Sequence, residues 1–349
     1  MVKACPHTSA ARLVPLRAGR DVTRSFARFR ARVLVVETER LEMRRSSRSA
    51  VPGGRPFVMA IATLALVQFG GPGHARAQPA APGAGVAAIL DSLDRTGRMV
   101  LAASGVVVET WDYASDGERV EAIAVRPEAP GRHPGLLLIP GYQRTARDYL
   151  PLALRLARAG YACVAVSQRG FGRSTGAPDF VGPATMRAID QGFSRLRAAG
   201  FVDSARVGVF GYSRGAIAAS LLATRRPDIH AAVFGGGIYD MTSAYHEIES
   251  PVIRDNMSRE SGDTTAAFAE RSSLGHMEQL RCPVLILHGG RDANAPAEQA
   301  RMLEARLDQL HKDYEIRIYE DRDHNLGMPT ILEATLDFFD RRLKEAVAR

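Results

Sequence analysis

The chain has 349 residues and a formal net charge of +8, a length that allows one large domain or two ordinary ones. The positive charge is confined to the N-terminal part, because residues 1–77 carry a net charge of +10 and the remaining residues a net charge of −2. This distribution excludes nucleic acid as an expected partner. No group of His, Cys, Asp and Glu residues has the spacing of metal ligands, so we expect neither a metal nor a cofactor.

The first 77 residues have the pattern of a targeting segment. An apolar run at 57–69 follows several arginines in 44–55 and precedes the small-x-small sequence Ala75-Arg76-Ala77. These are the three parts of a secretory signal, although a buried helix or an uncleaved anchor would also fit the apolar run. We predict a signal peptide at 43–77 that starts at Met43, with 1–42 as a disordered, over-extended gene start. The expected location is therefore secreted or periplasmic, in a bacterium because arginine outnumbers lysine 43 to 3.

The segment 78–104 is expected to hold an Ala/Pro/Gly-rich linker and then an amphipathic helix near 87–102. Two strands follow at 105–111 and 119–126. The turn Ser115-Asp116-Gly117 between them is typical of a hairpin.

From residue 105 to residue 349 the pattern predicts one domain in which strands and helices alternate. Further strands are expected at 136–139, 161–166, 207–210, 230–234, 284–287 and 314–319. Helices are expected at 147–159, 185–199, 214–225, 297–310 and 330–347. Fully apolar central strands in such an order predict an α/β fold with a mostly parallel, eight-stranded sheet and helices on both faces. The long polar insertion at about 236–281 predicts a small helical cap.

The sequence Gly211-Tyr212-Ser213-Arg214-Gly215 lies where the strand ending at Phe210 gives way to a helix. A serine at such a turn is lifted clear of the sheet, and the glycines let the crowded backbone pass. Ser213 is therefore our candidate nucleophile. A serine hydroxyl needs a base to take its proton and an acid to orient that base.

The two partners are expected in the chain order Ser, Asp, His at the ends of later strands. Asp292 follows the strand at 284–287, and His324 follows the strand at 314–319. We predict that His324 is the general base and that Asp292 orients it. Asp240 is the rival for the acid role.

Other histidines are interpreted as structural or peripheral. We expect His288, at the end of an apolar strand, to be packed and hydrogen-bonded. His246 and His276 lie in the cap insertion, where surface or core placement competes with a contact to substrate.

An oxyanion hole needs preorganised N–H donors beside the attacked carbonyl. We predict that the backbone amide of Arg214 supplies one donor and that of Tyr142 the other, with Gln143 as the alternative to Tyr142. Of the three cysteines, Cys163 and Cys282 fall on well-separated strands, which predicts two buried free thiols.

Several segments together resemble an α/β-hydrolase: the Pro140-Gly141-Tyr142 loop, Arg169-Gly170-Phe171-Gly172-Arg173-Ser174, the Ser213 pentapeptide, His288-Gly289-Gly290-Arg291-Asp292 and Asp323-His324. The stretch from Arg271 to Pro296 resembles the catalytic domain of prolyl-oligopeptidase-type (S9) peptidases and of dienelactone-hydrolase-like enzymes. Ala216 and Ala295 depart from the S9 pattern. A processed chain starting at residue 78 is too short for the β-propeller of the larger S9 enzymes.

The resemblance implies a serine hydrolase that cleaves an ester or amide bond through an acyl-enzyme intermediate, as an S9-like serine peptidase. The alternatives are a carboxylesterase or dienelactone-hydrolase-like enzyme, and a non-catalytic binding protein on the same fold. The expected partner is a small molecule or a short peptide, without stable membrane insertion once the signal is cleaved.

Overall fold

The computed structural model describes residues 82–345. The predicted gene start at 1–42, the signal peptide at 43–77 and the first four linker residues, 78–81, lie outside the described residues. Within 82–345 no helix has the length and apolar character needed to cross a membrane.

The described part begins with helix α1 (Pro82–Thr96), followed by strand β1 (Arg98–Leu101), the short 3₁₀ helix η1 (Ala102–Ser104) and strand β2 (Val106–Thr110). The helix begins at Pro82, inside the predicted linker, and ends at Thr96, so the prediction of a helix near 87–102 is wrong at both ends. Gly97 stops the helix by adopting φ +68, a left-handed conformation that favours glycine. The next four residues then form an edge strand, antiparallel to β2.

The predicted hairpin is present, but four shorter strands take the place of its two strands. Around the turn at Asp116 and Gly117, strands β3 (Tyr113–Ser115) and β4 (Glu118–Val120) form a separate two-stranded sheet. Strand β5 (Ala122–Pro127) then pairs antiparallel with β2 in the main sheet.

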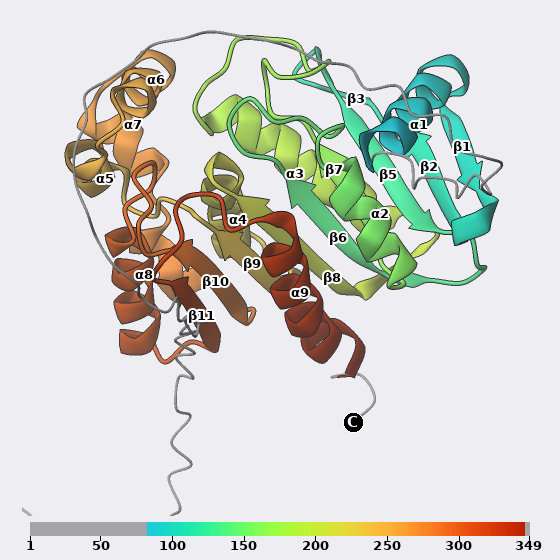
Figure 1. The fold of residues 1–349 in the computed structure, drawn as a ribbon. Coiled ribbons are helices and arrows are strands. Elements are labelled where there is room, and N and C mark those ends of the chain that lie inside the picture. The colour runs from blue at the N-terminus through green and yellow to red at the C-terminus, as the bar shows by residue number, and fades with distance from the viewer. Residues whose placement is uncertain (1–81, 346–349) are drawn as a thin grey trace, which may run out of the picture. The chain divides into compact units, whose positions relative to one another are not determined.

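From β6 onward, strands and helices alternate as expected (Figure 1). The strands are β6 (His133–Ile139), β7 (Ala162–Val166), β8 (Val202–Tyr212), β9 (Ala231–Gly235), β10 (Val284–Gly289) and β11 (Tyr314–Tyr319). The helices packed on them are α2 (Leu150–Arg158), α3 (Pro183–Ala198), α4 (Arg214–Arg225), α8 (Glu298–Gln309) and α9 (Met328–Phe339), the last continued by the π-helical segment η3 (Asp340–Lys344).

The main sheet has nine strands in the order β1-β2-β5-β7-β6-β8-β9-β10-β11, one more than the eight predicted, because β1 joins its edge. Six neighbouring strands in this order, β7-β6-β8-β9-β10-β11, run parallel to one another. The carboxyl ends of parallel strands meet at one edge of a sheet, which is where ligands bind in open α/β sheets.

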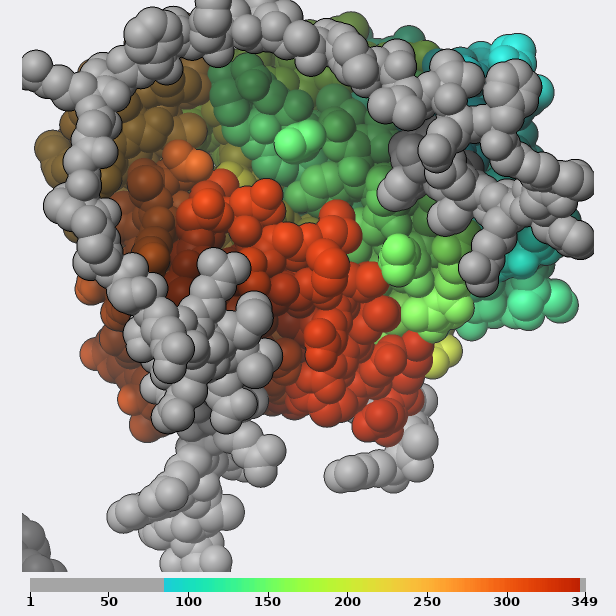
Figure 2. Space-filling view, viewed as in Figure 1, coloured from blue at the N-terminus to red at the C-terminus, as the bar shows by residue number. Residues whose placement is uncertain are grey.

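Two hydrophobic clusters cover the two faces of this sheet. Helices α1, α2 and α9 pack on one face through Leu93, Leu152 and Phe338. Helices α3, α4 and α8 pack on the other face through residues such as Phe193 and Leu221. The space-filling view in Figure 2 shows the red C-terminal residues beside green residues from the middle of the chain on the face carrying α9.

The two cysteines of the described chain are buried free thiols, as predicted. Cys163 belongs to one of the clusters and Cys282 to the other, so the sheet separates them.

Between β9 and β10 the predicted cap consists of α5 (Met241–Glu247), α6 (Pro251–Ser261), α7 (Thr265–Glu270) and the 3₁₀ helix η2 (Leu274–Gln279). The first three helices lie together beside the β10 and β11 end of the described domain (Figure 1).

Candidate active site

Ser213 occupies a sharp turn between β8 and α4. Its φ is +56, a strained conformation for a residue with a side chain. The glycines on either side are required by space, because a Cβ at Gly211 would overlap the Gly215 carbonyl and one at Gly215 would overlap the Ile139 carbonyl. The Ser213 amide donates to the Gly235 carbonyl at 2.7 Å, which ties the turn to the end of β9. The hydroxyl is thereby presented above the carboxyl ends of the strands.

The structure brings Ser213, His324 and Asp292 together in a hydrogen-bonded chain. The Ser213 Oγ lies 2.9 Å from His324 Nε2, and His324 Nδ1 lies 2.7 Å from Asp292 Oδ2. The Tyr212 hydroxyl donates to the His324 carbonyl at 2.8 Å and so fixes the loop after β11. In this arrangement the imidazole Nδ1–H donates to the carboxylate, which leaves Nε2 free to accept the serine proton.

The Asp292 side chain is fully buried and its second oxygen is also occupied. Oδ1 accepts hydrogen bonds from the amides of Asn294 at 2.9 Å and Ala295 at 2.8 Å. These amides hold the carboxylate in one orientation, so that Oδ2 points at the imidazole.

The rival acid, Asp240, has a different place. It is the N-cap of α5, where its Oδ1 accepts from the amides of Thr242 at 2.9 Å and Ser243 at 3.2 Å. A side chain that satisfies the free amides of a helix end has an ordinary structural role. The pairing with His324 therefore falls to Asp292.

His288 is buried and packed, as the sequence indicated. Its Nε2 lies 2.8 Å from the Ala295 carbonyl and 3.5 Å from Asp292 Oδ2. Burial lowers the pKa of His288 below its ordinary value, so the ring is a neutral donor to the loop that carries Asp292. His246 and His276 are exposed and do not line the cavity beside Ser213.

The loop after β6 passes directly over the serine. A Cβ on Gly141 would lie 3.1 Å from the Ser213 Cβ, so a side chain here would crowd the nucleophile. Tyr142 is the next residue, and Gln143 follows it with φ +55. The Gln168 side chain holds the loop by donating to the Pro140 carbonyl at 2.6 Å. The Arg214 amide begins α4, and the first amides of a helix have no acceptor inside it.

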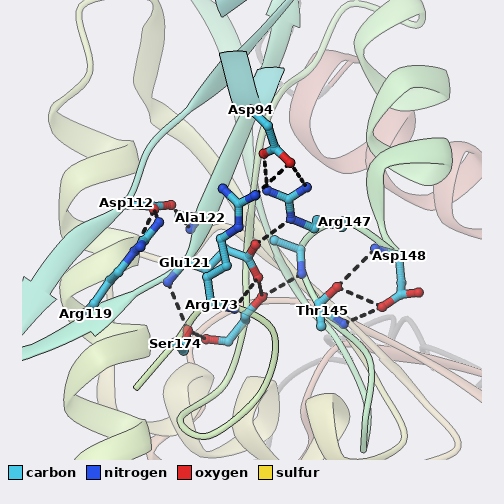
Figure 3. A network of polar contacts seen from close by, with 12 residues as sticks. Asp94, Asp112, Arg119, Glu121, Ala122, Thr145, Arg147, Asp148, Arg173 and Ser174 are labelled. Atoms are coloured by element: carbon cyan, nitrogen blue, oxygen red, sulfur yellow. Dashed lines mark hydrogen bonds and ion pairs between the residues drawn. The ribbon is translucent and has the colours of Figure 1, made fainter. Parts of the chain in front are cut away.

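A polar network centred on the buried Glu121 contacts this loop (Figure 3). At its centre Glu121 accepts from Arg147 Nε at 2.8 Å and from the Ser167 hydroxyl at 2.7 Å. Arg147 also donates to Asp94 of α1 at 2.6 Å, and Arg173 pairs with the same carboxylate at 2.7 Å. The hydrogen bond from Arg147 lowers the pKa of Asp94.

This network was not anticipated from the sequence. The available signal was Glu121 itself, a carboxylate between the apolar residues Val120 and Ala122 of a strand-like run. A buried carboxylate requires partners, and the network joins α1 to the loops after β6 and β7.

Ser213 and His324 open into a cavity of about 650 Å³. The cap contributes Ile253 and Asn256 of α6 to the lining of this cavity. The other apolar lining residues include Leu152, Phe180, Ile217, Ile238 and Ile331. A cavity lined by apolar side chains together with polar groups from several loops suits a small organic molecule or a short peptide.

A serine raised at a strand–helix turn over a mostly parallel sheet, beside a histidine and a carboxylate from later strand ends, defines a serine hydrolase with the α/β-hydrolase fold. The model of the prolyl oligopeptidase family (Peptidase_S9) matches residues 153–346. The chain belongs to this family.

Individual relatives and solved structures are similar to this chain. The uncharacterized peptidase YtmA of Bacillus subtilis is 30% identical over 218 residues, which are 61% of this chain and 84% of YtmA. Among solved structures, acylaminoacyl peptidase of Pyrococcus horikoshii aligns with a TM-score of 0.60 and 19% identity, over 68% of this chain and 42% of that protein. Acetyl xylan esterase from Paenibacillus sp. R4 aligns with a TM-score of 0.60 and 17% identity, over 74% of this chain and 94% of the esterase.

The chain differs in extent from some of these relatives. It spans less than half of the acylaminoacyl peptidase and about a third of two other curated relatives. The structural similarities, all below 25% identity, show the fold.

Proposed function

We propose that this protein hydrolyses an acyl bond through a covalent acyl-enzyme on Ser213, and that its substrate is a short peptide or a peptide-like amide. The observation that carries the proposal is the hydrogen-bonded chain from Ser213 through His324 to Asp292, with distances of 2.9 and 2.7 Å. Membership of the prolyl oligopeptidase family supports the choice of a peptide-like substrate.

In the acylation step, His324 Nε2 takes the Ser213 hydroxyl proton as the serine oxygen bonds to the substrate carbonyl carbon. The negative charge that develops on the carbonyl oxygen is held by the amides of Tyr142 and Arg214. His324 then returns the proton to the leaving amine or alcohol, whose bond to the carbonyl carbon breaks. A single oxyanion donor of this kind contributes roughly 10²–10³ to the rate in other serine hydrolases.

Deacylation repeats the sequence with water in the place of the serine. His324 accepts a proton from the water as the water oxygen bonds to the acyl carbon. The proton then passes to the departing Ser213 oxygen, which releases a carboxylic acid. Asp292 accepts the Nδ1–H hydrogen bond and so stabilises the imidazolium that forms twice in each cycle.

A carboxylic ester is the second candidate substrate. The apolar lining of the cavity by Leu152, Ile217 and Ile331 favours it, because such walls bind an acyl chain without requiring a peptide backbone. The same residues would perform the chemistry on either substrate.

We further propose that the enzyme acts outside the cytoplasm on small molecules or short peptides. The arginine-rich segment, apolar run and Ala75-Arg76-Ala77 site of the leader support export. Cell fractionation with an antibody against the folded domain tests this, and recovery of the protein in the cytoplasm alone would contradict it.

The catalytic proposal is tested with the Ser213→Ala variant. This variant should lose roughly 10⁴-fold or more of its rate on an activated acyl ester and should no longer be labelled by a fluorophosphonate, while its circular dichroism stays unchanged. Ser250→Ala is the matched control, since Ser250 makes no side-chain capping hydrogen bond at the start of α6. Full activity in Ser213→Ala would refute the proposal, and a wild-type protein that is never labelled would favour a binding protein on this fold.

The choice between substrates needs a direct comparison on the purified wild-type protein. Aminoacyl and N-acyl dipeptide amides are assayed beside short acyl esters of similar size. Higher kcat/KM for the amides, corrected for their lower intrinsic reactivity, would support the peptidase. Turnover of esters alone would support the carboxylesterase.

A further inference from the structure

The Arg214 side chain is buried beside the nucleophile, although arginine is rarely fully buried without a partner. Its side chain is 4% exposed, and that of Glu260, which pairs with it, is 7% exposed. Arg214 Nη1 donates to Glu260 Oε2 at 2.7 Å. Within residues 82–345, Glu260 is the one ion-pair partner of this guanidinium.

The two members of the pair come from different parts of the fold. Arg214 is the first residue of α4 and directly follows Ser213, whereas Glu260 lies near the end of cap helix α6. The ion pair therefore joins the cap to the turn that presents the nucleophile. Burial lowers the pKa of Arg214 and Glu260 opposes that effect, so the carboxylate compensates for the lost hydration of the cation.

Aromatic rings enclose the same guanidinium. Its Cζ lies 4.2 Å from the ring centre of Phe180, 4.5 Å from that of Tyr142 and 5.5 Å from that of Phe171. Tyr142 and Phe171 also contact each other edge to face, with centres 5.6 Å apart. Desolvated cation–π contacts of this kind are among the stronger ones.

These contacts connect the two residues whose amides we assign to the oxyanion hole. The backbone of Arg214 supplies one amide and that of Tyr142 the other. The Tyr142 ring packs directly on the Arg214 guanidinium. Holding the cation in place therefore also holds the Tyr142 loop against the start of α4. Without Glu260, the cation would remain buried without a counter-charge, which is costly enough to drive it toward solvent.

We propose that the Arg214 side chain and Glu260 are positioning residues for the oxyanion hole, which is fully formed only while cap helix α6 is docked on the Ser213 turn. Neither side chain touches the reacting atoms in this role. The docked arrangement of α6 is thus the arrangement competent for hydrolysis. This inference rests on the proposed acyl-enzyme chemistry.

The test is the Glu260→Gln variant, which keeps the shape of the side chain and removes its charge. The substrate is p-nitrophenyl acetate, which is too small to depend on cap contacts for binding. Rates are expressed per active site titrated with a fluorophosphonate. We expect kcat to fall by about 10- to 100-fold, because small displacements of catalytic groups have effects of this size, with KM changed by less than about two-fold.

A second readout addresses the oxyanion hole directly. An alkyl boronic acid forms a tetrahedral adduct with Ser213 that places an oxygen where the oxyanion would lie. Its inhibition constant should rise in Glu260→Gln by about the same factor as kcat falls, because both depend on the same amides. A loss of folded protein alone would lower the number of titrated sites and leave both quantities unchanged.

Asp255→Asn is the matched control. It also removes a carboxylate from α6, but from an exposed pair with Arg259 in which the side chains are 68% and 60% exposed. Its kcat and boronic acid affinity should equal those of the wild type.

The double variant Arg214→Met/Glu260→Met separates positioning from stability. Removing both buried charges should restore much of the stability lost in Glu260→Met alone. The proposal requires that kcat stays low in this double variant.

The inference would be overturned if Glu260→Gln kept the wild-type kcat per titrated site. It would also be overturned if the double variant recovered kcat together with stability. A wild-type enzyme that is neither labelled nor active would instead mean that the proposed function itself has failed.

Discussion

Replacing Asp292 by asparagine should stop catalysis while leaving its loop in place. Oδ1 of Asp292 accepts from two amides at 2.9 and 2.8 Å. The asparagine carbonyl must take over this position, because a flipped amide would set an NH₂ group against both N–H donors. That arrangement would cost roughly 1–3 kcal/mol for each unsatisfied amide.

The NH₂ group of the introduced asparagine then faces His324 Nδ1, which the carboxylate of Asp292 approaches at 2.7 Å in the wild type. Since NH₂ is a donor, Nδ1 must become the acceptor and the proton moves to Nε2. A protonated Nε2 cannot take the Ser213 proton. We expect kcat to fall roughly 10⁴-fold, the size of loss known for the wrong histidine tautomer in such sites, which corresponds to about 5 kcal/mol of barrier.

The assay is steady-state hydrolysis of an activated ester, with titration of Ser213 as a check on folding. Asp240→Asn is the control, because Asp240 caps α5 rather than binding His324. Its rate should stay within a few-fold of the wild type. The reasoning is wrong if Asp292→Asn keeps a tenth of the wild-type kcat, or if Asp240→Asn loses more activity than Asp292→Asn.

Two further predictions concern stability. Glu121→Gln should lower the free energy of unfolding in urea by about 1–3 kcal/mol, because one hydrogen of the new amide will face the donor of Arg147 or Ser167. The control Glu128→Gln, at an exposed position, should leave the free energy of unfolding unchanged. Equal losses in the two variants would contradict this prediction. For His288, burial lowers the folded-state pKa, so the unfolded chain binds more protons below its ordinary pKa. Stability should therefore rise from about pH 5 to about pH 7, with this residue contributing at most about 1.4 kcal/mol per pH unit. His288→Gln should show a shallower dependence on pH, and an unchanged slope would refute the assignment.

Much of the fold could be predicted because its central strands are continuous apolar runs between helices. The runs ending at Phe210, Leu287 and Tyr319 indicated where strands finish, and Ser213, Asp292 and His324 follow these ends. Parallel strands bring such ends together whatever the details of the loops. The proximity of these three side chains therefore followed from the order of the elements.

The edge of the sheet was harder to predict. Residues 98–101 form too short a run to distinguish a strand from a last helical turn by their apolar pattern. Their conformation depends on pairing with β2, a contact between chain segments that no local pattern reports. Gly97 was the available sign that the helix ends.

The ion pair at Arg214 was hidden for a related reason. A charged residue after the nucleophile and another in a polar cap helix both look like solvated side chains in a sequence. Their burial depends on how α6 sits against the Ser213 turn, and two positions that are 46 residues apart along the chain give no indication of it. Tertiary packing alone makes them partners.

The two buried cysteines have a practical consequence for following the cap in solution. Burial raises the pKa of the Cys282 thiol to about 12 and that of Cys163 further still, so neither forms the reactive thiolate at neutral pH. A cysteine introduced at exposed Val252 on α6 would be the preferred target of a maleimide dye in a protein that begins after Cys5. The described domain thus has no readily labelled thiol of its own, so the fluorescence of a single dye can report on the surroundings of α6.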